Sequence, residues 1–183
     1  ATHMTEREAL RLGESNAIVG LCPITEANLG DGLFPAFPFF AAGGRFGIGS
    51  DSNVLIDLTE ELRWLEYGQR LVQRSRNVLA TGAGHSTGQD IFAAAVAGGA
   101  NALGVAGGLA VGHSADLVSL DSQHPSLAGK SRCSIVDGFL FAGGRGAIDA
   151  VWRRGERLVT GGRHRARAQL AEDYRQALAV LVA

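Results

Sequence analysis

Short apolar runs alternate with amphipathic stretches over the first hundred residues of the chain. The run AIVGL at 17–21 lies between Asn16 and Pro23, and the run FGIG at 46–49 ends just before Asp51. Continuous apolar runs of this length are typical of strands buried on both faces, as in a parallel sheet. Because helical patterns follow these runs, the order strand, loop, helix predicts an α/β fold with parallel strands.

Helical patterns begin near the start of the chain. Thr5 and Glu8 have the spacing of a capping box, which predicts a short helix to about Arg11. A longer helix is expected after Asp51, with further helices over 72–80 and over 90–97, the last ended by the pair Gly98-Gly99. The stripe of the longer helix consists of Leu58, Leu62, Leu65 and Val72, with Glu60, Glu61, Glu66 and Arg70 on its other faces.

The segment between the two predicted strands is long for a connection. Residues 22–44 contain three prolines and four phenylalanines. A segment of this length and composition is more typical of a structured functional loop than of a spacer.

The pattern changes again near residue 107. Strands are expected at 115–121, at 134–141 and at 148–159, the last interrupted by a hairpin turn at Arg154-Gly155-Glu156. These strands predict a small all-β module over residues 107–165. A final helix over 166–182 carries Leu170, Tyr174, Leu178 and Leu181 on one stripe, which we expect to dock on another part of the molecule.

The α/β part, residues 1–106, contains only two predicted strands. Two parallel strands do not form a sheet with a core of its own. We therefore expect the missing strands to precede Ala1, so that the chain is a C-terminal piece. Alone, such a piece would expose a strand edge and apolar helix faces, and we expect it to aggregate or to be molten.

Composition excludes several classes of partner. The chain is 46% apolar and 19% charged, with a formal charge of −1, so no basic excess is available for nucleic acid or an anionic membrane surface. The one dense basic run, at 163–167, is interpreted as a solvated face. Cys22 and Cys133 lie far apart in the sequence and predict reduced thiols in a cytoplasmic protein. No apolar stretch is long enough to span a bilayer.

Asp51 is the first candidate for chemistry, because it follows a buried strand. In parallel α/β folds, active sites form at the carboxyl ends of strands, where a carboxylate ligates a metal or accepts a proton. Alternatively, Asp51 caps the following helix or hydrogen-bonds the loop at Ser52 and Asn53. After the first strand, Glu26 and Asn28 either orient a substrate or close their own loop.

The five histidines form no recognisable metal motif. They are His3, His85, His113, His124 and His164, and no two of them have HxH or HExxH spacing. A catalytic zinc site needs about three protein ligands, so Asp51 without partners cannot hold zinc.

Taken together, five phrases resemble the C-terminal half of the amidohydrolase superfamily. They are ATHMTE, CPITEANLGDG, GIGSDSN, GLAVGHSADLVSLD and AVWRRGERLVTGGRH. The resemblance implies the C-terminal part of a (β/α)8 metal-dependent hydrolase barrel, part of a small β-sandwich domain and a C-terminal helix. The loop with Glu26, where many relatives have Pro-x-Ser-Asn-x-x-Leu, is most similar to that of the formimidoylglutamate deiminases.

This resemblance also implies an activity and roles for particular residues. The activity is hydrolysis of N-formimidoyl-L-glutamate to N-formyl-L-glutamate and ammonia by a cytoplasmic homodimer. Asp51 corresponds to the aspartate that ligates the catalytic zinc and takes a proton from its bound water. Glu26 and Asn28 become candidates for the substrate pocket.

The chain lacks other residues of the superfamily pattern. The HxH pair of the first strand and the histidines of the fifth and sixth strands are absent, and the last of these would directly precede Ala1. His3 is therefore not assigned as a ligand, and we expect the chain alone to bind zinc poorly and to be inactive. Two alternatives stay open: a superfamily deaminase acting on an aminopurine or adenosine-like substrate, which the TEANLGDG loop disfavours, and a non-catalytic degenerate barrel.

Overall fold

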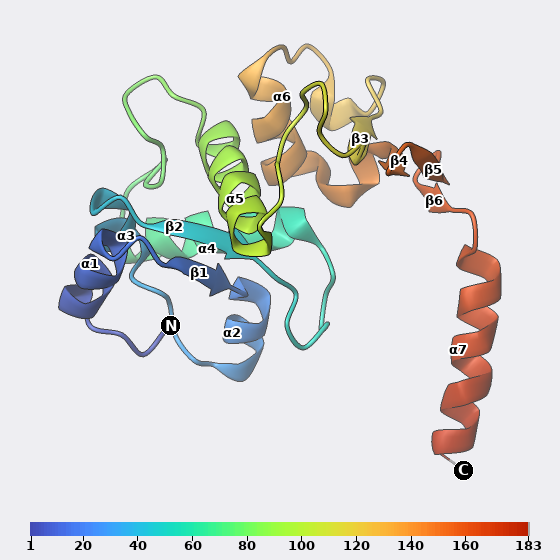
Figure 1. Cartoon of the computed structure of the whole chain (residues 1–183), viewed down its shortest axis with the longest axis horizontal. Helices are drawn as coiled ribbons and strands as arrows, with labels where there is room; N and C mark the ends of the chain where they lie inside the picture. Colours follow the sequence, from blue (N-terminus) through green and yellow to red (C-terminus); the bar gives the residue numbers. More distant parts are fainter. Residues whose placement is uncertain (183) are drawn as a thin grey trace.

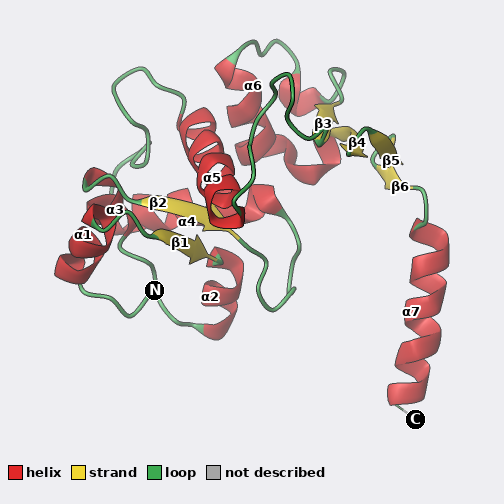
Figure 2. Cartoon of the chain, in the orientation of Figure 1, coloured by secondary structure: helices red, strands yellow, loops and turns green. Residues whose placement is uncertain are grey.

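The computed structural model describes residues 1–182 and contains two sheets with helices packed around them. Figure 1 shows that the final helix extends away from the remainder of the chain, and Figure 2 shows how few residues are in strands. The helices are α1 (Glu6–Glu14), α2 (Pro23–Leu29), α3 (Ala36–Ala41), α4 (Leu58–Gln73), α5 (Thr87–Leu103), α6 (Cys133–Gly138) and α7 (Arg167–Leu181). The strands are β1 (Ile18–Leu21), β2 (Arg45–Ile48), β3 (Leu117–Leu120), β4 (Ile148–Arg153), β5 (Glu156–Thr160) and β6 (Arg163–His164).

Strands β1 and β2 form a two-stranded parallel sheet, as the two apolar runs predict. Ile18 lies opposite Arg45 and Leu21 opposite Ile48. The Gly49 N–H donates to the Leu21 carbonyl at 3.1 Å, so the ladder continues one residue beyond β2. Both strands therefore end at the same edge of the sheet, where the chain enters two different loops.

The capping box at the start of α1 is confirmed. Thr5 Oγ1 accepts the Glu8 N–H at 3.3 Å, and Glu8 Oε2 accepts the Thr5 N–H at 2.8 Å. The helix continues to Glu14, beyond the predicted end at Arg11. The sequence between these two points contains no proline that would stop it.

Helices α2 and α3 lie in the segment 22–44, which the sequence predicts as a loop. Pro23 stands at the first position of α2 and Pro38 in the first turn of α3. The first turn of a helix leaves its N–H groups without intrahelical partners, so proline is tolerated there. The loop prediction is therefore wrong for these residues, because these prolines start helices rather than exclude them.

A row of aromatic rings forms the core beside β2. The ring centroids of Phe34 and Phe39 are 5.2 Å apart, those of Phe39 and Phe40 are 5.2 Å apart, and those of Phe40 and Phe46 are 4.9 Å apart. Phe34, Phe39 and Phe46 are buried. Each fully buried phenylalanine contributes about 1.5–3 kcal/mol, so this row is a main source of stability for the α/β part.

The buried face of α4 differs from the predicted apolar stripe. Leu62 and Leu65 are buried as expected, whereas Leu58 and Val72 are 43% and 58% exposed. The carboxylate-bearing side chains of Glu61 and Glu66 are 1% and 0% exposed, although the pattern predicts them on other faces. Both accept hydrogen bonds from buried backbone N–H groups, and this explains why acidic residues occupy the interior.

Glu66 explains why the helix predicted over 72–80 does not form. Its Oε1 accepts the Val78 N–H at 3.1 Å and its Oε2 accepts the Leu79 N–H at 3.0 Å. Helix α4 ends at Gln73 and is capped by Arg74, whose φ of 51° is left-handed, and the chain then turns back toward α4. The backbone of this segment is therefore bonded to a side chain instead of to its own carbonyl groups.

Gln69 fixes the connection that leads into α3. Its side-chain Oε1 accepts the Phe37 N–H at 3.3 Å, and its Nε2 donates to the Phe34 carbonyl at 2.9 Å. Gln69 is 3% exposed. One amide side chain thus pairs a backbone acceptor before α3 and a backbone donor in its first turn.

Helix α5 does not end at Gly98-Gly99 as predicted but runs through this pair to Leu103. A Cβ atom built on Gly98 would lie 1.8 Å from the Phe46 carbonyl oxygen. The helix and β2 therefore meet backbone to backbone, and the glycine serves this close approach instead of terminating the helix.

The C-terminal region contains a four-stranded antiparallel sheet with the order β3-β4-β5-β6. The predicted hairpin turn is confirmed, since Arg153 pairs with Glu156 across Arg154 and Gly155. The strand predicted at 134–141 is wrong: this segment forms α6 and the π-helical turn η2 (Phe139–Gly143). Its apolar residues, Ile135, Val136, Phe139 and Leu140, are spaced as on one helical face.

Helix α6 and η2 pack on the α/β part through polar contacts. Arg63 of α4 donates from Nε and Nη2 to the Leu140 carbonyl at 2.9 and 2.7 Å. Asp137 Oδ1 accepts the Gly88 N–H at the start of α5 at 2.7 Å. The connections η1 (Pro125–Leu127) and η3 (Gly144–Ala147) complete this helical segment between β3 and β4.

Helix α7 forms nearly where it is predicted but does not dock. None of its described residues is buried, and the stripe residues Leu170 and Tyr174 are 57% and 66% exposed. Figure 1 shows α7 extending from β6 without lying along another element. Within residues 1–182, no apolar surface reaches this stripe, so the predicted docking is wrong for this chain.

A search of the described helices finds none with both the length and the hydrophobicity needed to cross a membrane.

The crossing of α5 and β2 predicts opposite effects for two neighbouring glycines. Gly98→Ala should lower the free energy of unfolding by about 1–3 kcal/mol or more, because the new methyl group overlaps the Phe46 carbonyl. Gly99→Ala is the matched control, since a Cβ atom there has no atom within 4 Å. It should leave stability unchanged or raise it by up to about 1 kcal/mol through helix propensity. Thermal unfolding of the two variants, each made in the full-length protein, checks this, and equal losses of stability would contradict it.

Candidate functional site

Two loops leave the same edge of the parallel sheet and are bonded to each other. The loop after β1 contains α2, and the loop after β2 contains Asp51. Thr25 Oγ1 lies 3.2 Å from the Ser50 carbonyl oxygen and 3.0 Å from Ser52 Oγ. The Ser52 N–H also donates to Thr25 Oγ1 at 3.4 Å. One threonine hydroxyl therefore joins α2 to both residues that flank Asp51.

Asp51 lies exposed at the tip of a tight turn. The Asn53 N–H donates to the Ser50 carbonyl at 3.0 Å, and Ser50 Oγ donates to Asn53 Oδ1 at 2.8 Å. Asp51 and Asn53 both have left-handed backbones, with φ of 45° and 55°. Asparagine and aspartate adopt this conformation more readily than other residues with side chains.

The structure excludes the alternative that Asp51 caps the following helix, because a different residue caps α4. Asp57 Oδ1 accepts the Thr59 N–H at 2.9 Å and the Thr59 hydroxyl at 2.6 Å. The Asp51 carboxylate accepts no hydrogen bond from residues 1–182, neither at the helix start nor from Ser52 or Asn53. Its side chain is therefore free for chemistry at the edge of the sheet.

The two candidates on α2 have different environments. Glu26 is half-buried, and its Oε1 accepts the Cys22 N–H at 3.1 Å, which closes the first turn of its own helix. Asn28 is exposed near the end of α2. Of the two alternatives for Glu26, the structure thus supports the loop-closing role for one of its oxygen atoms.

Glu61 also lies in this region, although the sequence pattern does not identify it as a site residue. Its Oε2 accepts the Ile24 N–H at 2.9 Å, and its Oε1 has no partner among the described residues. Burial raises the pKa of Glu61, the Ile24 N–H opposes this rise, and the negative charges of Glu26, Asp51 and Asp57 add to it. The carboxyl group therefore retains its proton to a higher pH than an exposed glutamate does.

Cys22 lies between the two strand ends. A Cβ atom on Gly49 would lie 3.4 Å from its Sγ. Burial raises the pKa of the Cys22 thiol, and the charges of Asp51, Glu61 and Glu26 raise it further. A thiol in this environment is mostly protonated near neutral pH, so Cys22 is a poor nucleophile.

The donor atoms do not form a metal site by themselves. Within residues 1–182, no three His, Cys, Asp or Glu side chains lie close enough together to hold a metal ion. His3 is exposed, and His85 Nδ1 lies 2.7 Å from Thr81 Oγ1, away from the strand ends. Asp51 alone supplies fewer than the three protein ligands of a catalytic zinc site, so zinc does not fit the described residues as a complete set.

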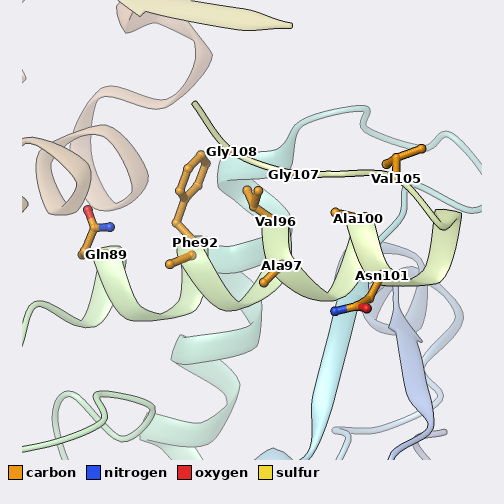
Figure 3. Close-up of a pocket in the computed structure, with 10 residues that line it drawn as sticks. Gln89, Phe92, Val96, Ala97, Ala100, Asn101, Val105, Gly107 and Gly108 are labelled. Carbon is orange, nitrogen blue, oxygen red and sulfur yellow. The ribbon is translucent and has the colours of Figure 1, made fainter. Parts of the chain in front are cut away.

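An apolar pocket lies away from the strand ends. It has a volume of about 490 Å³ and lies between α5 and the segment that follows this helix. Figure 3 shows Phe92 and Val96 pointing from α5 toward Gly107 and Gly108. The lining residues include no titratable side chain and none of Asp51, Glu26 and Asn28. An apolar hollow of this kind supplies no acid, base or ligand for catalysis.

Comparison with known proteins gives consistent matches over most or all of the chain. The family model described as "Amidohydrolase family" matches residues 1–158. A formimidoylglutamate deiminase from Pseudomonas aeruginosa is 47% identical over 183 residues, which is 100% of this chain and 40% of that protein. The crystal structure of an amidohydrolase from Brucella melitensis superposes with a TM-score of 0.91 at 50% identity, covering 100% of this chain and 40% of that one.

A solved structure with lower sequence identity also has a similar fold. The crystal structure of an adenosine deaminase from Xanthomonas campestris, with bound zinc, superposes with a TM-score of 0.77 at 27% identity. It covers 96% of this chain and 40% of that one. The chain thus spans about 40% of the length of the relatives it matches.

The raised pKa of Glu61 predicts how stability depends on pH. The stabilisation that comes from the protonated carboxyl group is fully present below about pH 4.5, the ordinary value, and is lost as pH rises through the higher folded-state pKa. Glu61→Gln keeps an acceptor for the Ile24 N–H and does not titrate. The stability of this variant relative to the parent protein should therefore increase as pH rises above about 4.5.

Urea unfolding of the full-length parent protein and its Glu61→Gln variant between pH 4 and pH 8 measures this difference. Glu14→Gln, at an exposed position at the end of α1, is the matched control and should show no such trend. A stability difference between Glu61→Gln and the parent that is constant with pH would contradict the assignment.

Proposed function

Because this chain belongs to the amidohydrolase family, we propose that it is the C-terminal part of a hydrolase whose active site includes the strand ends next to Asp51. The parallel pair β1–β2 with its helices is proposed to belong to a (β/α)8 barrel, over residues 1–106. The antiparallel sheet β3–β6 is proposed to belong to a small β-sandwich, over residues 107–165. The remaining segment, 166–183, is proposed as the C-terminal helix unit; it contains α7, and its residue 183 lies outside the described residues.

The proposed substrate is N-formimidoyl-L-glutamate. Water adds to the formimino carbon, the bond from this carbon to the terminal nitrogen breaks, and ammonia leaves. The oxygen of water remains on the carbon, so the product is N-formyl-L-glutamate. One observation carries this proposal: the 47% identity to the Pseudomonas formimidoylglutamate deiminase extends over all 183 residues, including both loops at the sheet edge.

Asp51 is proposed as the residue that accepts a proton from the attacking water. Its carboxylate is exposed at the end of β2 and makes no hydrogen bond with the described residues, so both oxygen atoms are available. In the whole enzyme, the same carboxylate is proposed as one ligand of a zinc ion, and the other ligands are proposed to lie outside this chain. Bound zinc lowers the pKa of water toward 7, and a nearby carboxylate can then take the proton.

Glu26 and Asn28 are proposed as pocket residues on the neighbouring loop. Asn28 is exposed, so its amide is free to bind a substrate group. Glu26 uses one oxygen for the Cys22 N–H, and only the other is available. The remaining proposals are a small-molecule substrate without nucleic acid, consistent with the formal charge of −1, a cytoplasmic location and a homodimer.

A second candidate is the deamination of an aminopurine or adenosine-like substrate. The zinc-bound adenosine deaminase from Xanthomonas campestris matches 96% of this chain and favours this alternative. Its 27% identity is lower than the 47% identity to the formimidoylglutamate deiminase. For this reason the formimidoylglutamate reaction is the first proposal.

The full-length protein should release ammonia from N-formimidoyl-L-glutamate and not from adenosine. Asp51→Asn should lower kcat/KM by about 10²–10⁴-fold, because asparagine cannot accept the proton. Asp173→Asn, the same change on the exposed helix α7, is the matched control and should have full activity. A coupled assay for ammonia measures the activity of the parent protein and of the two variants. Release of ammonia from adenosine alone would contradict the proposal.

A further inference from the structure

We infer that Thr25 is a positioning residue, which fixes Asp51 by bonding the residue on each side of it. The catalytic role of Asp51 in this inference rests on the proposed function. The hydrogen bonds that place Thr25 beside Asp51 are independent of that function. Thr25 is 2% exposed and lies in the first turn of α2, whereas Asp51 is exposed on the loop after β2. Thr25 is therefore placed to act through the backbone and not on a substrate.

The Thr25 hydroxyl makes three contacts, and they lie on both sides of Asp51. The Ser50 carbonyl oxygen can only accept, so the Thr25 hydroxyl donates its single proton there, at 3.2 Å. Oγ1 also accepts the Ser52 N–H, at 3.4 Å, and lies 3.0 Å from Ser52 Oγ, a pair in which either hydroxyl can donate. The hydroxyl thus uses its whole hydrogen-bonding capacity on the two neighbours of Asp51.

Asp51 needs such external support because its backbone is left-handed. Its φ of 45° is sparsely populated by residues with a side chain, and Asn53 has a φ of 55° two residues later. An exposed loop with two such residues has other conformations available to it. The bonds from Thr25 favour the one that keeps the Asp51 carboxylate at the edge of the sheet.

Thr25 is itself held by a buried group. The N–H of the preceding residue, Ile24, donates to Glu61 Oε2 at 2.9 Å, and Ile24 and Glu61 are both buried. Glu61 belongs to the long helix α4. The hydroxyl that fixes the Asp51 turn is therefore anchored to the interior and not to another exposed loop.

Displacing the proton acceptor lowers the rate of the chemical step more than it weakens substrate binding. A misplacement of about 1 Å at a reacting centre can cost about 10²-fold in rate. Because Thr25 is buried beneath the turn, its loss should change kcat and leave KM nearly unchanged. A loss of kcat at nearly unchanged KM distinguishes a positioning residue from a residue that contacts the substrate.

The test compares Thr25→Val with Thr25→Ser in the full-length protein. Valine keeps the shape of threonine and removes the hydroxyl, whereas serine keeps the hydroxyl and removes a methyl group. Thr25→Val should lower kcat by about 10–100-fold with KM within about twofold, while Thr25→Ser should have close to parent activity. Amide hydrogen exchange at Ser52 and Asn53 should be faster in Thr25→Val and unchanged in Thr25→Ser.

Each outcome decides the inference. Equal kinetics for the two variants would overturn it, because a packing role responds to the methyl group and not to the hydroxyl. If the parent protein does not hydrolyse N-formimidoyl-L-glutamate, the proposed function fails, and hydrogen exchange alone then decides whether Thr25 holds the turn. If Thr25→Val does not fold, Ser52→Ala removes one bond from the exposed side and should give a smaller loss of kcat; no loss would overturn the inference.

Discussion

Buried backbone groups must find hydrogen-bond partners, and in the α/β part of this protein α4 supplies them to three different loops. A two-stranded sheet leaves most of the neighbouring chain without ladder partners, and each unpaired buried N–H would cost about 1–3 kcal/mol. Glu61, Glu66 and Gln69 face the interior from one side of α4 and bond the connections at Ile24, at Val78 and Leu79, and at Phe34 and Phe37. The fold around the sheet edge depends on these polar side chains as much as on the row of phenylalanines.

Most of the regular elements could be predicted from local pattern. Some errors concern local signals, as at the prolines that start α2 and α3, and others arise where distant parts of the chain meet. The capping box at Thr5 and the apolar runs of β1 and β2 are local signals, and they are confirmed. The stripe on α4 was predicted by treating acidic residues as exposed, but Glu61 is buried because a distant N–H needs an acceptor. Gly98 resembles a helix end in sequence, and only the approach of β2 shows why a glycine is required within α5.

The candidate site was predictable in part. Asp51 follows a buried strand, and the general rule that active sites form at the carboxyl ends of parallel strands identifies it without a structure. Thr25 and Glu61 could not be found this way. Thr25 is 25 residues from its partner Ser50, and Glu61 is 37 residues from Ile24, so these pairs depend on how β1, β2 and α4 are arranged in space.

The saturated hydroxyl of Thr25 has a consequence for reagents and modifying enzymes. An alcohol reacts with an electrophile through an oxygen lone pair, and this oxygen already accepts the Ser52 N–H and is hydrogen-bonded to Ser52 Oγ. Phosphorylation or acylation of Thr25 would have to break these bonds and open a buried turn. A covalent inhibitor directed at this end of the sheet would thus find Thr25 inert, and the accessible group would be the carboxylate beside it.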